Sequence, residues 1–391
     1  MSDIVILGAK RTPIGSMLGQ FTGVATPVLG TAAIAGALEH AGIAADRVDE
    51  VIMGCVLPAG LGQAPARQAA RAAGIPDAAG ATTINKVCGS GMKSIMLAHD
   101  IIRAGSAKVV VAGGMESMTN APHLLNGSRT GIRYGSAEFL DHMAFDGLTD
   151  PYEGKAMGVF GDAAVAKYGF TREQVDAYST ESVRRAQQAI ADGAFKAEIV
   201  PVTVKGRKGE VVVDSDEEPG KIDIAKIPGL RAAFGKDGVL TAASSSKISD
   251  GAAAVVVMSA DEASKIDALP LARIVAHATH SQAPEWFTTA PVRAIVNVLD
   301  KAGWAAGDVD LYEINEAFSL VAMAPIHDLG IRHDKVNVNG GAVALGHPIG
   351  ASGARLVVTL LHALQARGGR RGVASLCIGG GEATAIALEL C

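Results

Sequence analysis

The sequence predicts an α/β protein that contains two copies of one strand–helix–strand unit. The copies are visible as three pairs of matching segments, in the same order along the chain: 38–49 with 299–310, 90–91 with 352–353, and 113–116 with 379–382. The longest pair is identical at seven of twelve positions, and the offset between copies drifts only from 261 to 266. Ordered matches of this kind indicate an internal duplication. Strand–helix–strand order in each copy predicts parallel sheets with helices on their faces.

The elements of each copy follow from apolar spacing and from the residues that end helices. We expect a strand, a helix and a strand at 81–84, 90–103 and 108–112 in the first copy, and at 336–339, 352–367 and 372–377 in the second. In the first helix, Met92, Ile95 and Met96 recur at near-helical spacing. Gly105 and Gly368 stand where the two helices are expected to end.

Residues 119–248 interrupt this pattern. They are richer in Gly, Asp, Glu and Lys, and they predict isolated elements: a helix that opens with a capping box from Thr171 to Gln174, and a hairpin turn at 205–210. We expect an inserted loop domain that covers the site, because binding loops commonly decorate a rigid scaffold. The expected division is residues 1–118 and 249–268 for the N-terminal half, 119–248 for the insertion, and 269–391 for the C-terminal half.

Composition excludes several classes of protein. Of the 391 residues, 49% are hydrophobic and 19% are charged, which is typical of a globular chain. The net charge of −5 argues against a nucleic-acid surface, and the absence of 18 consecutive apolar residues predicts no membrane span. The N-terminal residues resemble neither a signal peptide nor a transit peptide, so we expect a cytoplasmic protein. The four cysteines are then expected to be reduced, and without a CxxC spacing they predict no structural zinc.

Two cysteines lie in glycine-rich turns almost three hundred residues apart. Cys88 stands at the expected start of a helix, where backbone N–H groups and the positive helix end favour a thiolate. His347, in the turn Gly-His-Pro-Ile-Gly, could take its proton. Cys377 precedes three glycines, a turn that can expose N–H groups as an anion nest, whereas the GxGxxG spacing of a dinucleotide loop is missing. This layout predicts covalent acyl transfer.

Each of these residues also has a structural alternative. Cys88 could be a small buried hydrophobe, and His347 could be a structural histidine. Asn315 follows the apolar run 311–314, at a strand end where ligand sites form in α/β proteins, but it could instead be a cap or turn residue. Glu316 could be a base or a partner in a structural ion pair. The glycine-flanked turn at a helix start favours the catalytic interpretation of Cys88.

Together, these segments resemble the thiolase family. The motifs that carry the likeness are Asn-Lys-Val-Cys-Gly-Ser-Gly at 85–91, Asn-Glu-Ala-Phe at 315–318, Gly-His-Pro-Ile-Gly at 346–350 and Cys-Ile-Gly-Gly-Gly at 377–381. The likeness runs over essentially the whole chain and is strongest to the biosynthetic acetyl-CoA acetyltransferases. It implies a duplicated α/β unit in α-β-α-β-α layers with an inserted loop domain. It also implies a reversible, ping-pong condensation of two acetyl-CoA molecules to acetoacetyl-CoA and CoA through an acyl-cysteine.

The resemblance implies a role for each motif residue. Cys88 is acylated by the thioester, and His347 takes its proton and helps to form an oxyanion hole. Asn315 contributes to that hole through a bound water. Cys377 removes a proton from the second acetyl group and returns it in the reverse reaction. Backbone N–H groups of Cys88 and Gly379 form a second oxyanion hole.

The resemblance also implies the substrate contacts and the partners. The coenzyme A contacts are Leu230, Phe234, Ala242 and Ser246, and the acyl-pocket wall is Met157, Ala317 and Phe318. Acetyl-CoA, acetoacetyl-CoA and CoA are the expected ligands, with no required cofactor, no metal, no nucleic acid and no membrane. Family members form homodimers or homotetramers that are dimers of dimers. Three residues depart from the family pattern: Ala156 replaces a histidine of many bacterial members, Lys247 replaces a small residue, and Pro219 replaces a tyrosine of some potassium-using members, so we predict no potassium site.

Three alternative functions remain. A β-ketoacyl synthase would share the duplicated fold, but it would carry two histidines instead of the pair His347 and Cys377. A catalytically silent acyl-CoA-binding paralogue is disfavoured by the intact motif residues. A degradative 3-ketoacyl-CoA thiolase of broader chain length is harder to exclude, because pocket volume cannot be read from the sequence.

Overall fold

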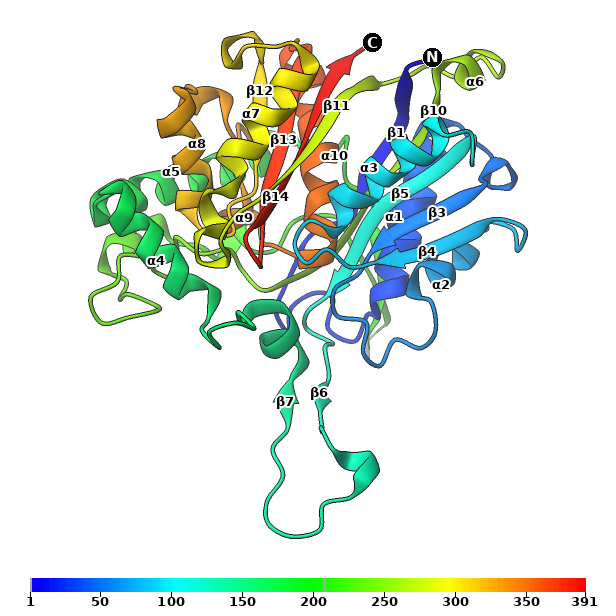
Figure 1. The fold of residues 1–391 in the computed structure, drawn as a ribbon. Coiled ribbons are helices and arrows are strands. Elements are labelled where there is room, and N and C mark those ends of the chain that lie inside the picture. Colours follow the sequence, from blue (N-terminus) through cyan, green and yellow to red (C-terminus); the bar gives the residue numbers. More distant parts are fainter. Residues whose placement is uncertain (1, 207–208) are drawn as a thin grey trace.

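Ten of the strands form one large mixed sheet (Figure 1). The computed structural model describes residues 2–206 and 209–391. The sheet contains β1 (Ile4–Arg11), β2 (Gly15–Ser16), β3 (Glu50–Gly54), β4 (Gly80–Ile84), β5 (Val109–Ser117), β10 (Ser249–Ser259), β11 (Ala272–Ser281), β12 (Leu311–Ile314), β13 (Arg371–Ile378) and β14 (Glu382–Leu390). Its order is β12-β13-β14-β11-β1-β10-β5-β3-β4, and β2 pairs with β10.

Helices lie on both sides of this sheet and also between its two halves. The α-helices are α1 (Thr26–Ala41), α2 (Pro65–Ala72), α3 (Ser90–Arg103), α4 (Met157–Tyr168), α5 (Arg172–Ala191), α6 (Ala260–Ser264), α7 (Ala290–Ala302), α8 (Ser319–Leu329), α9 (Ala342–Leu345) and α10 (Ile349–Arg367). In the first half, α1 packs on β1, β5 and β10, and α2 packs on β3 and β4. In the second half, α7 packs on β11, β13 and β14.

Two equivalent helices, α3 and α10, form the central layer. Helix α3 packs on β3, β5 and β10 and also reaches β14, while α10 packs on β5 and β10 from one half and on β12 and β13 from the other. Among the described residues, the two half-sheets meet through two residue pairs, Val5 with Arg273 and Ile6 with Ala272. The layers therefore run α-β-α-β-α, which confirms the fold expected from the family resemblance.

The duplicated Ser-Gly pairs lie where these central helices touch. A Cβ added to Gly91 would stand 2.8 Å from the backbone nitrogen of Ala354, and one added to Gly353 would stand 2.4 Å from that of Met92. Both distances are too short for any side chain, so the close approach of α3 and α10 requires glycine in both copies. The match between 90–91 and 352–353 in the sequence thus has a packing reason.

Two expectations about the strands are wrong. The sheet is mixed instead of parallel: β3 runs parallel to β4 and β5, and β12 to β13, but the pairs that involve β1, β10, β11 and β14 are antiparallel. The short glycine turn after Ile378 can join only antiparallel neighbours. The strand expected at 336–339 is also missing, because Val336 makes only an isolated bridge and Asn337 turns the chain at φ +48°.

The insertion between β5 and β10 contains two hairpins and two long helices. Strands β6 (His123–Leu124) and β7 (Leu140–Asp141) form the stem of an arm that projects from the body (Figure 1). Helix α5 opens with the predicted capping box of Thr171 and Gln174. The predicted hairpin consists of β8 (Val202–Gly206) and β9 (Gly209–Val213), and its tip at 207–208 lies outside the described residues.

Helix α10 is long and apolar enough by composition to cross a membrane, with a mean hydropathy of 1.2 over its 18-residue window. Of that window, 89% is buried inside the protein. The helix therefore belongs to the core, and it carries the turn of His347 at its N-terminal end.

Candidate active site

Cys88 lies in a strained turn between β4 and α3. Val87, a β-branched residue, has φ +46°, a left-handed conformation that is costly for such a side chain. Ser90 holds this turn, since its Oγ accepts from the N–H of Lys86 at 2.8 Å and donates to the carbonyl of Val87 at 2.7 Å. Glycine follows Cys88 because a Cβ on residue 89 would stand 2.4 Å from Cδ1 of Ile378 and would displace that side chain. The cysteine is thus presented by a fixed backbone beside the end of β13.

The Cys88 thiol is protonated at rest, which corrects the expectation of a thiolate. Burial raises the pKa of Cys88 to about 11, although the N–H groups of Gly379 and of Cys88 itself bond to the sulfur and lower it. The glycine turns do aim N–H groups at the sulfur, as the sequence suggested, but the loss of hydration has the larger effect. The structure therefore holds a neutral thiol under two backbone donors.

His347 is the predicted base, and it is buried and neutral. Burial lowers the pKa of His347 to about 3, and the guanidinium of Arg355 lowers it further in the same direction. The backbone N–H of His347 donates to the carbonyl of Lys247 at 3.0 Å and contacts the Oγ of Ser249 at 3.3 Å. The turn is therefore anchored to the segment that leads into β10.

Ser352, one turn into α10, sets the tautomer of His347. Its Oγ donates to the carbonyl of Pro348 at 2.9 Å and lies 2.5 Å from Nδ1 of His347. Because the hydroxyl proton points to Pro348, the oxygen accepts from Nδ1–H of the ring. We assign the remaining lone pair to Nε2, the nitrogen that can accept a proton from a thiol. The sequence showed Ser352 only as part of the duplication and gave no sign of this contact.

Asn315 follows β12 and approaches the same ring. Its Nδ2 lies 3.4 Å from Nε2 of His347, and its side chain is fully buried. Its Oδ1 makes no hydrogen bond within the described residues. The structure thus brings the amide and the imidazole together, as the motif pattern predicted.

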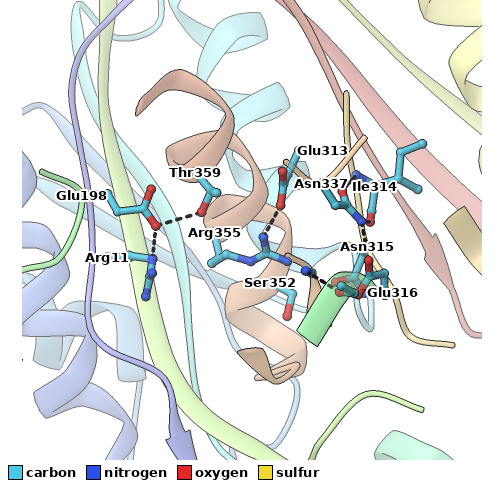
Figure 2. Close-up of polar contacts among 12 residues, drawn as sticks. Arg11, Glu198, Glu313, Ile314, Asn315, Glu316, Asn337, Ser352, Arg355 and Thr359 are labelled. Atoms are coloured by element: carbon cyan, nitrogen blue, oxygen red, sulfur yellow. Dashed lines mark hydrogen bonds and ion pairs between the residues drawn. The ribbon is translucent and has the colours of Figure 1, made fainter. Parts of the chain in front are cut away.

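Glu316 has a structural environment, but its hydrogen-bond partners are uncharged, so the expected ion pair is not found among the described residues. Its carboxylate accepts from the hydroxyls of Tyr178 and Ser182 at 2.8 Å each, from Nδ2 of Asn337 at 2.8 Å, and from the N–H of Val343 at 3.2 Å. It is fully buried and is not among the residues that line the pocket. Asn337 also bonds the backbone of Ile314 (Figure 2), and the cluster therefore fixes the loop that carries Asn315.

A buried ion pair lies behind the imidazole. Arg355 of α10 donates to Glu313 of β12 at 2.6 Å (Figure 2). Burial raises the pKa of Glu313 to about 7, against the opposing effect of the guanidinium. The pair ties α10 to the strand before Asn315, and its cation is the one that lowers the pKa of His347.

Cys377 stands at the end of β13 and is fully buried. It packs with Ala317, Phe318 and Leu240. Burial raises its pKa well above the ordinary range of a thiol, and the neighbouring Cys88 raises it further. A thiolate formed here would be a strong base. The second cysteine therefore lies close to the first, as the two glycine turns suggested.

A pocket of about 290 Å³ opens beside these residues. It is lined by Met118, Leu148, Ala156, Met157, Gly158, Phe234, Ser245, Ser246, Lys247, Ile248, Ala317, Phe318, His347 and Ile349. Met157, Phe234, Ser246, Ala317 and Phe318 are predicted substrate contacts.

Two of the predicted contacts, Leu230 and Ala242, are not among the lining residues. Cys88 packs on Met118 and Ile349, two residues that line the pocket. His347 itself lines the pocket, whereas Cys88, Cys377 and Asn315 are not among its lining residues and lie behind its wall.

Glu116 supports the site by bonding the backbone around it, and the sequence analysis assigned it no role. This fully buried carboxylate at the end of β5 accepts from the N–H groups of Val56 at 2.9 Å, Leu57 at 3.1 Å and Gly350 at 2.9 Å. Burial raises its pKa to about 7, although these three donors oppose the shift. Its contact with Gly350 holds the first turn of α10, the helix that follows His347. The recurrence of this glutamate as Glu382 was the available signal.

One group of potential metal ligands occurs within the described residues, away from this pocket. His99 and Asp100 of α3 and His277 of β11 place three ligand atoms 2.9–3.2 Å apart. These distances are those of ordinary hydrogen bonds among the three side chains. The absence of a required metal stays a prediction.

Known proteins resemble this chain over its whole length. The family model "Thiolase, N-terminal domain" matches residues 4–261, and "Thiolase, C-terminal domain" matches residues 268–390. The chain is 48% identical to the acetyl-CoA acetyltransferase of Cupriavidus necator, over 100% of both chains. It is 49% identical to acetyl-CoA acetyltransferase 2 of Arabidopsis thaliana, over 99% of this chain and 97% of that one. The crystal structure of the Bacillus anthracis acetyl-CoA acetyltransferase superposes with a TM-score of 0.97 at 40% identity, covering 100% of this chain and 99% of the other.

Proposed function

The chain belongs to the thiolase family, and we propose that it acts as an acetyl-CoA acetyltransferase that converts two acetyl-CoA molecules reversibly to acetoacetyl-CoA and CoA. Full-length relatives that carry this name support the activity. The observation that carries the mechanism is the convergence of two thiols and one imidazole of fixed tautomer beside a single pocket.

In the first half-reaction, Sγ of Cys88 attacks the thioester carbonyl of acetyl-CoA. Because the resting thiol has a pKa of about 11, its proton passes to Nε2 of His347 during the attack, not before it. The oxyanion forms beside the imidazole and Asn315, whose free Oδ1 is suited to hold a bridging water. Collapse of the intermediate releases CoA, which leaves with a proton from Cys377, and acetyl-Cys88 remains.

In the second half-reaction, the Cys377 thiolate removes a proton from the methyl carbon of a second acetyl-CoA. The resulting carbanion attacks acetyl-Cys88, and the oxyanion of that step accepts from the N–H groups of Cys88 and Gly379. Both N–H groups lower the pKa of the Cys88 thiol in the free enzyme, which supports this role. Acetoacetyl-CoA leaves, and the proton on His347 returns to the sulfur of Cys88. Protons and electrons balance over the cycle.

Two effects make the carbon–carbon bond accessible. A preorganised oxyanion donor typically contributes about 10²–10³ in rate, and a positioned base about 10²–10⁴. The high pKa of Cys377 makes its thiolate a stronger base toward a carbon acid. A covalent acyl-enzyme also means that the two substrates need not occupy the pocket together.

Further features of the proposal follow from the family. CoA serves as substrate and product, and we propose no cofactor or metal. We propose the three-part division at 118, 248 and 268, and a homodimer or a dimer of dimers. The projecting arm between β6 and β7 supports assembly, because Tyr134 and Phe139 on it are exposed. We also propose a cytoplasmic location.

A thiolysis assay tests this function. Purified protein mixed with acetoacetyl-CoA and CoA should form two acetyl-CoA, and Cys88→Ser should abolish turnover with an unchanged fold by circular dichroism. The same assay with longer 3-ketoacyl-CoA substrates tests the degradative alternative. A protein that binds acetoacetyl-CoA but gives no acetyl-CoA would contradict the proposal.

A further inference from the structure

The loop at 241–247 is hydrogen-bonded to both catalytic segments of the C-terminal half, the segment after Asn315 and the turn of His347. The N–H of Ser246 donates to the carbonyl of Ala317 at 3.0 Å, and the N–H of Ser319 donates to the carbonyl of Ser244 at 2.9 Å. At its other end, the carbonyl of Lys247 accepts from the N–H of His347 at 3.0 Å. The position of this loop therefore affects both the segment after Asn315 and the turn of His347.

Lys247 folds its side chain back onto this loop. Its Nζ donates to the carbonyl of Ser245 at 3.0 Å and to the carbonyl of Ala242. Within the part of the chain that the structure describes, the ammonium donates to no carboxylate. Glu218 and Glu316 act on its charge through space and raise its pKa. The backbone carbonyls of the loop are therefore the hydrogen-bond partners of this cation.

The ammonium is charged at neutral pH in spite of its surroundings. Burial lowers the pKa of Lys247 to about 8, and the two glutamates oppose that shift. His347, which lines the same pocket, is neutral and therefore adds no second positive charge beside the ammonium. Keeping a cation here costs solvation energy, and the two carbonyl contacts offset part of it.

We propose that Lys247 is a positioning residue whose ammonium acts as an internal cation, closing the 241–247 loop through the carbonyls of Ala242 and Ser245 and so shaping the pocket for the CoA thioester. The inference rests on the proposed function for the identity of the ligand. The closure itself is a property of the free protein. Carbonyl oxygens left without the ammonium would repel one another, and the loop would relax away from the pocket.

Variants at this position separate charge from bulk. Lys247→Met keeps the length of the side chain without charge, and Lys247→Arg keeps the charge. Lys247→Ala leaves room for an ammonium ion from solution. Lys226→Met, at a lysine whose side chain is 78% exposed, removes one positive charge elsewhere in the same insertion and serves as the matched control.

The first measurement is the affinity for desulfo-CoA, a ligand that cannot react, by calorimetry. The Met and Ala variants should bind about tenfold more weakly, and the Arg variant and the Lys226 control should bind as wild type does. In turnover, the loss should appear in KM more than in kcat. Ammonium chloride should restore binding by the Ala variant, while tetramethylammonium chloride, which has no N–H donors, should not.

The second measurement needs no CoA ligand. Ammonium should raise the thermal unfolding midpoint of Lys247→Ala more than that of wild type. If ammonium and tetramethylammonium act alike, or if Met, Ala and Arg variants all bind desulfo-CoA as wild type does, the proposal is overturned. If the Ala variant does not fold, the contrast of Met with Arg decides. A wild-type protein that does not bind desulfo-CoA would instead contradict the proposed function.

Discussion

The turns of Cys88 and His347 occupy equivalent places in the two copies but are held in different ways. Each precedes a helix of the central layer, and each contacts one member of the duplicated serine pair, Ser90 or Ser352. Each is also tied to a glutamate of the other copy. Glu116 of the first copy accepts from Gly350, while Glu382 of the second copy pairs with Lys86. The halves therefore brace each other's catalytic turn.

The difference between the two braces is burial. Glu116 is fully buried and accepts from three backbone N–H groups. Glu382 and Lys86 form an ion pair whose side chains are 35% and 23% exposed. Likewise, Ser90 bonds only backbone, whereas Ser352 bonds the imidazole itself. The comparison teaches that duplication supplied a common scaffold, and that each turn then acquired the contacts that its chemistry requires.

The largest expected effect comes from the His347 turn, where Asn315 helps to stabilise the charge of the oxyanion. Asn315→Ala removes the amide 3.4 Å from Nε2 of His347. Because its contact matters mainly in the transition state, kcat should fall by about 10²–10³ with a smaller change in KM. Steady-state kinetics of thiolysis measure both constants. A change confined to KM would mean that Asn315 only positions the substrate.

The two braces should differ in their effect on stability. Glu116→Ala leaves three buried N–H groups without acceptors and should lower the free energy of unfolding by about 3 kcal/mol or more. Glu382→Ala breaks a partly exposed pair, so its cost should be about 1 kcal/mol or less. Denaturant unfolding of the two variants side by side checks this order. Equal losses would remove the distinction drawn above.

The smallest effect concerns the charge of the resting Cys88 thiol, which should be visible in the rate at which this cysteine is labelled. With a pKa of about 11, the thiol is protonated at neutral pH. As the pH rises toward that value, the thiolate fraction increases about tenfold for each pH unit. The rate of iodoacetamide labelling at Cys88, read by peptide mapping, should therefore climb steadily from pH 7 to 9.5. Acetyl-CoA should protect Cys88 and leave the exposed Cys391 reactive. A rate that is already level near pH 7 would indicate a resting thiolate–imidazolium pair.

Local signals in the sequence predicted much of the fold. Helix α3 has the predicted bounds at both ends, because its apolar spacing and the glycine that follows it are local signals. The antiparallel strands were missed, since strand direction depends on how distant segments meet. The strand predicted at 336–339 does not form. Val336 is apolar, as a strand residue would be, but the side chain of Asn337 bonds Ile314 and Glu316, and the chain turns there.

The candidate site was predictable to the extent that its residues stand in distinctive turns. The glycine-flanked cysteines and the histidine turn were predicted as catalytic residues from the sequence, and the structure brings them together. Ser352, Glu116 and Lys247 were not given roles, because their importance lies in contacts with residues far away in the sequence. The protonated state of Cys88 was mispredicted for the same reason: burial is a property of the assembled layers.

The central claim is that the two cysteines divide the work, with Cys88 carrying the acyl group and Cys377 moving the carbon-bound proton. Mass spectrometry of Cys377→Ala after incubation with acetyl-CoA tests it most directly, with deuterium exchange of the acetyl methyl group followed in parallel. Loss of the Cys377 proton would slow the release of CoA. The variant is therefore incubated for a long time with a limiting amount of acetyl-CoA. The account predicts an acetyl group on Cys88, no methyl exchange and no acetoacetyl-CoA. A correctly folded variant that stays unacetylated, or that still condenses two acetyl groups, would contradict it.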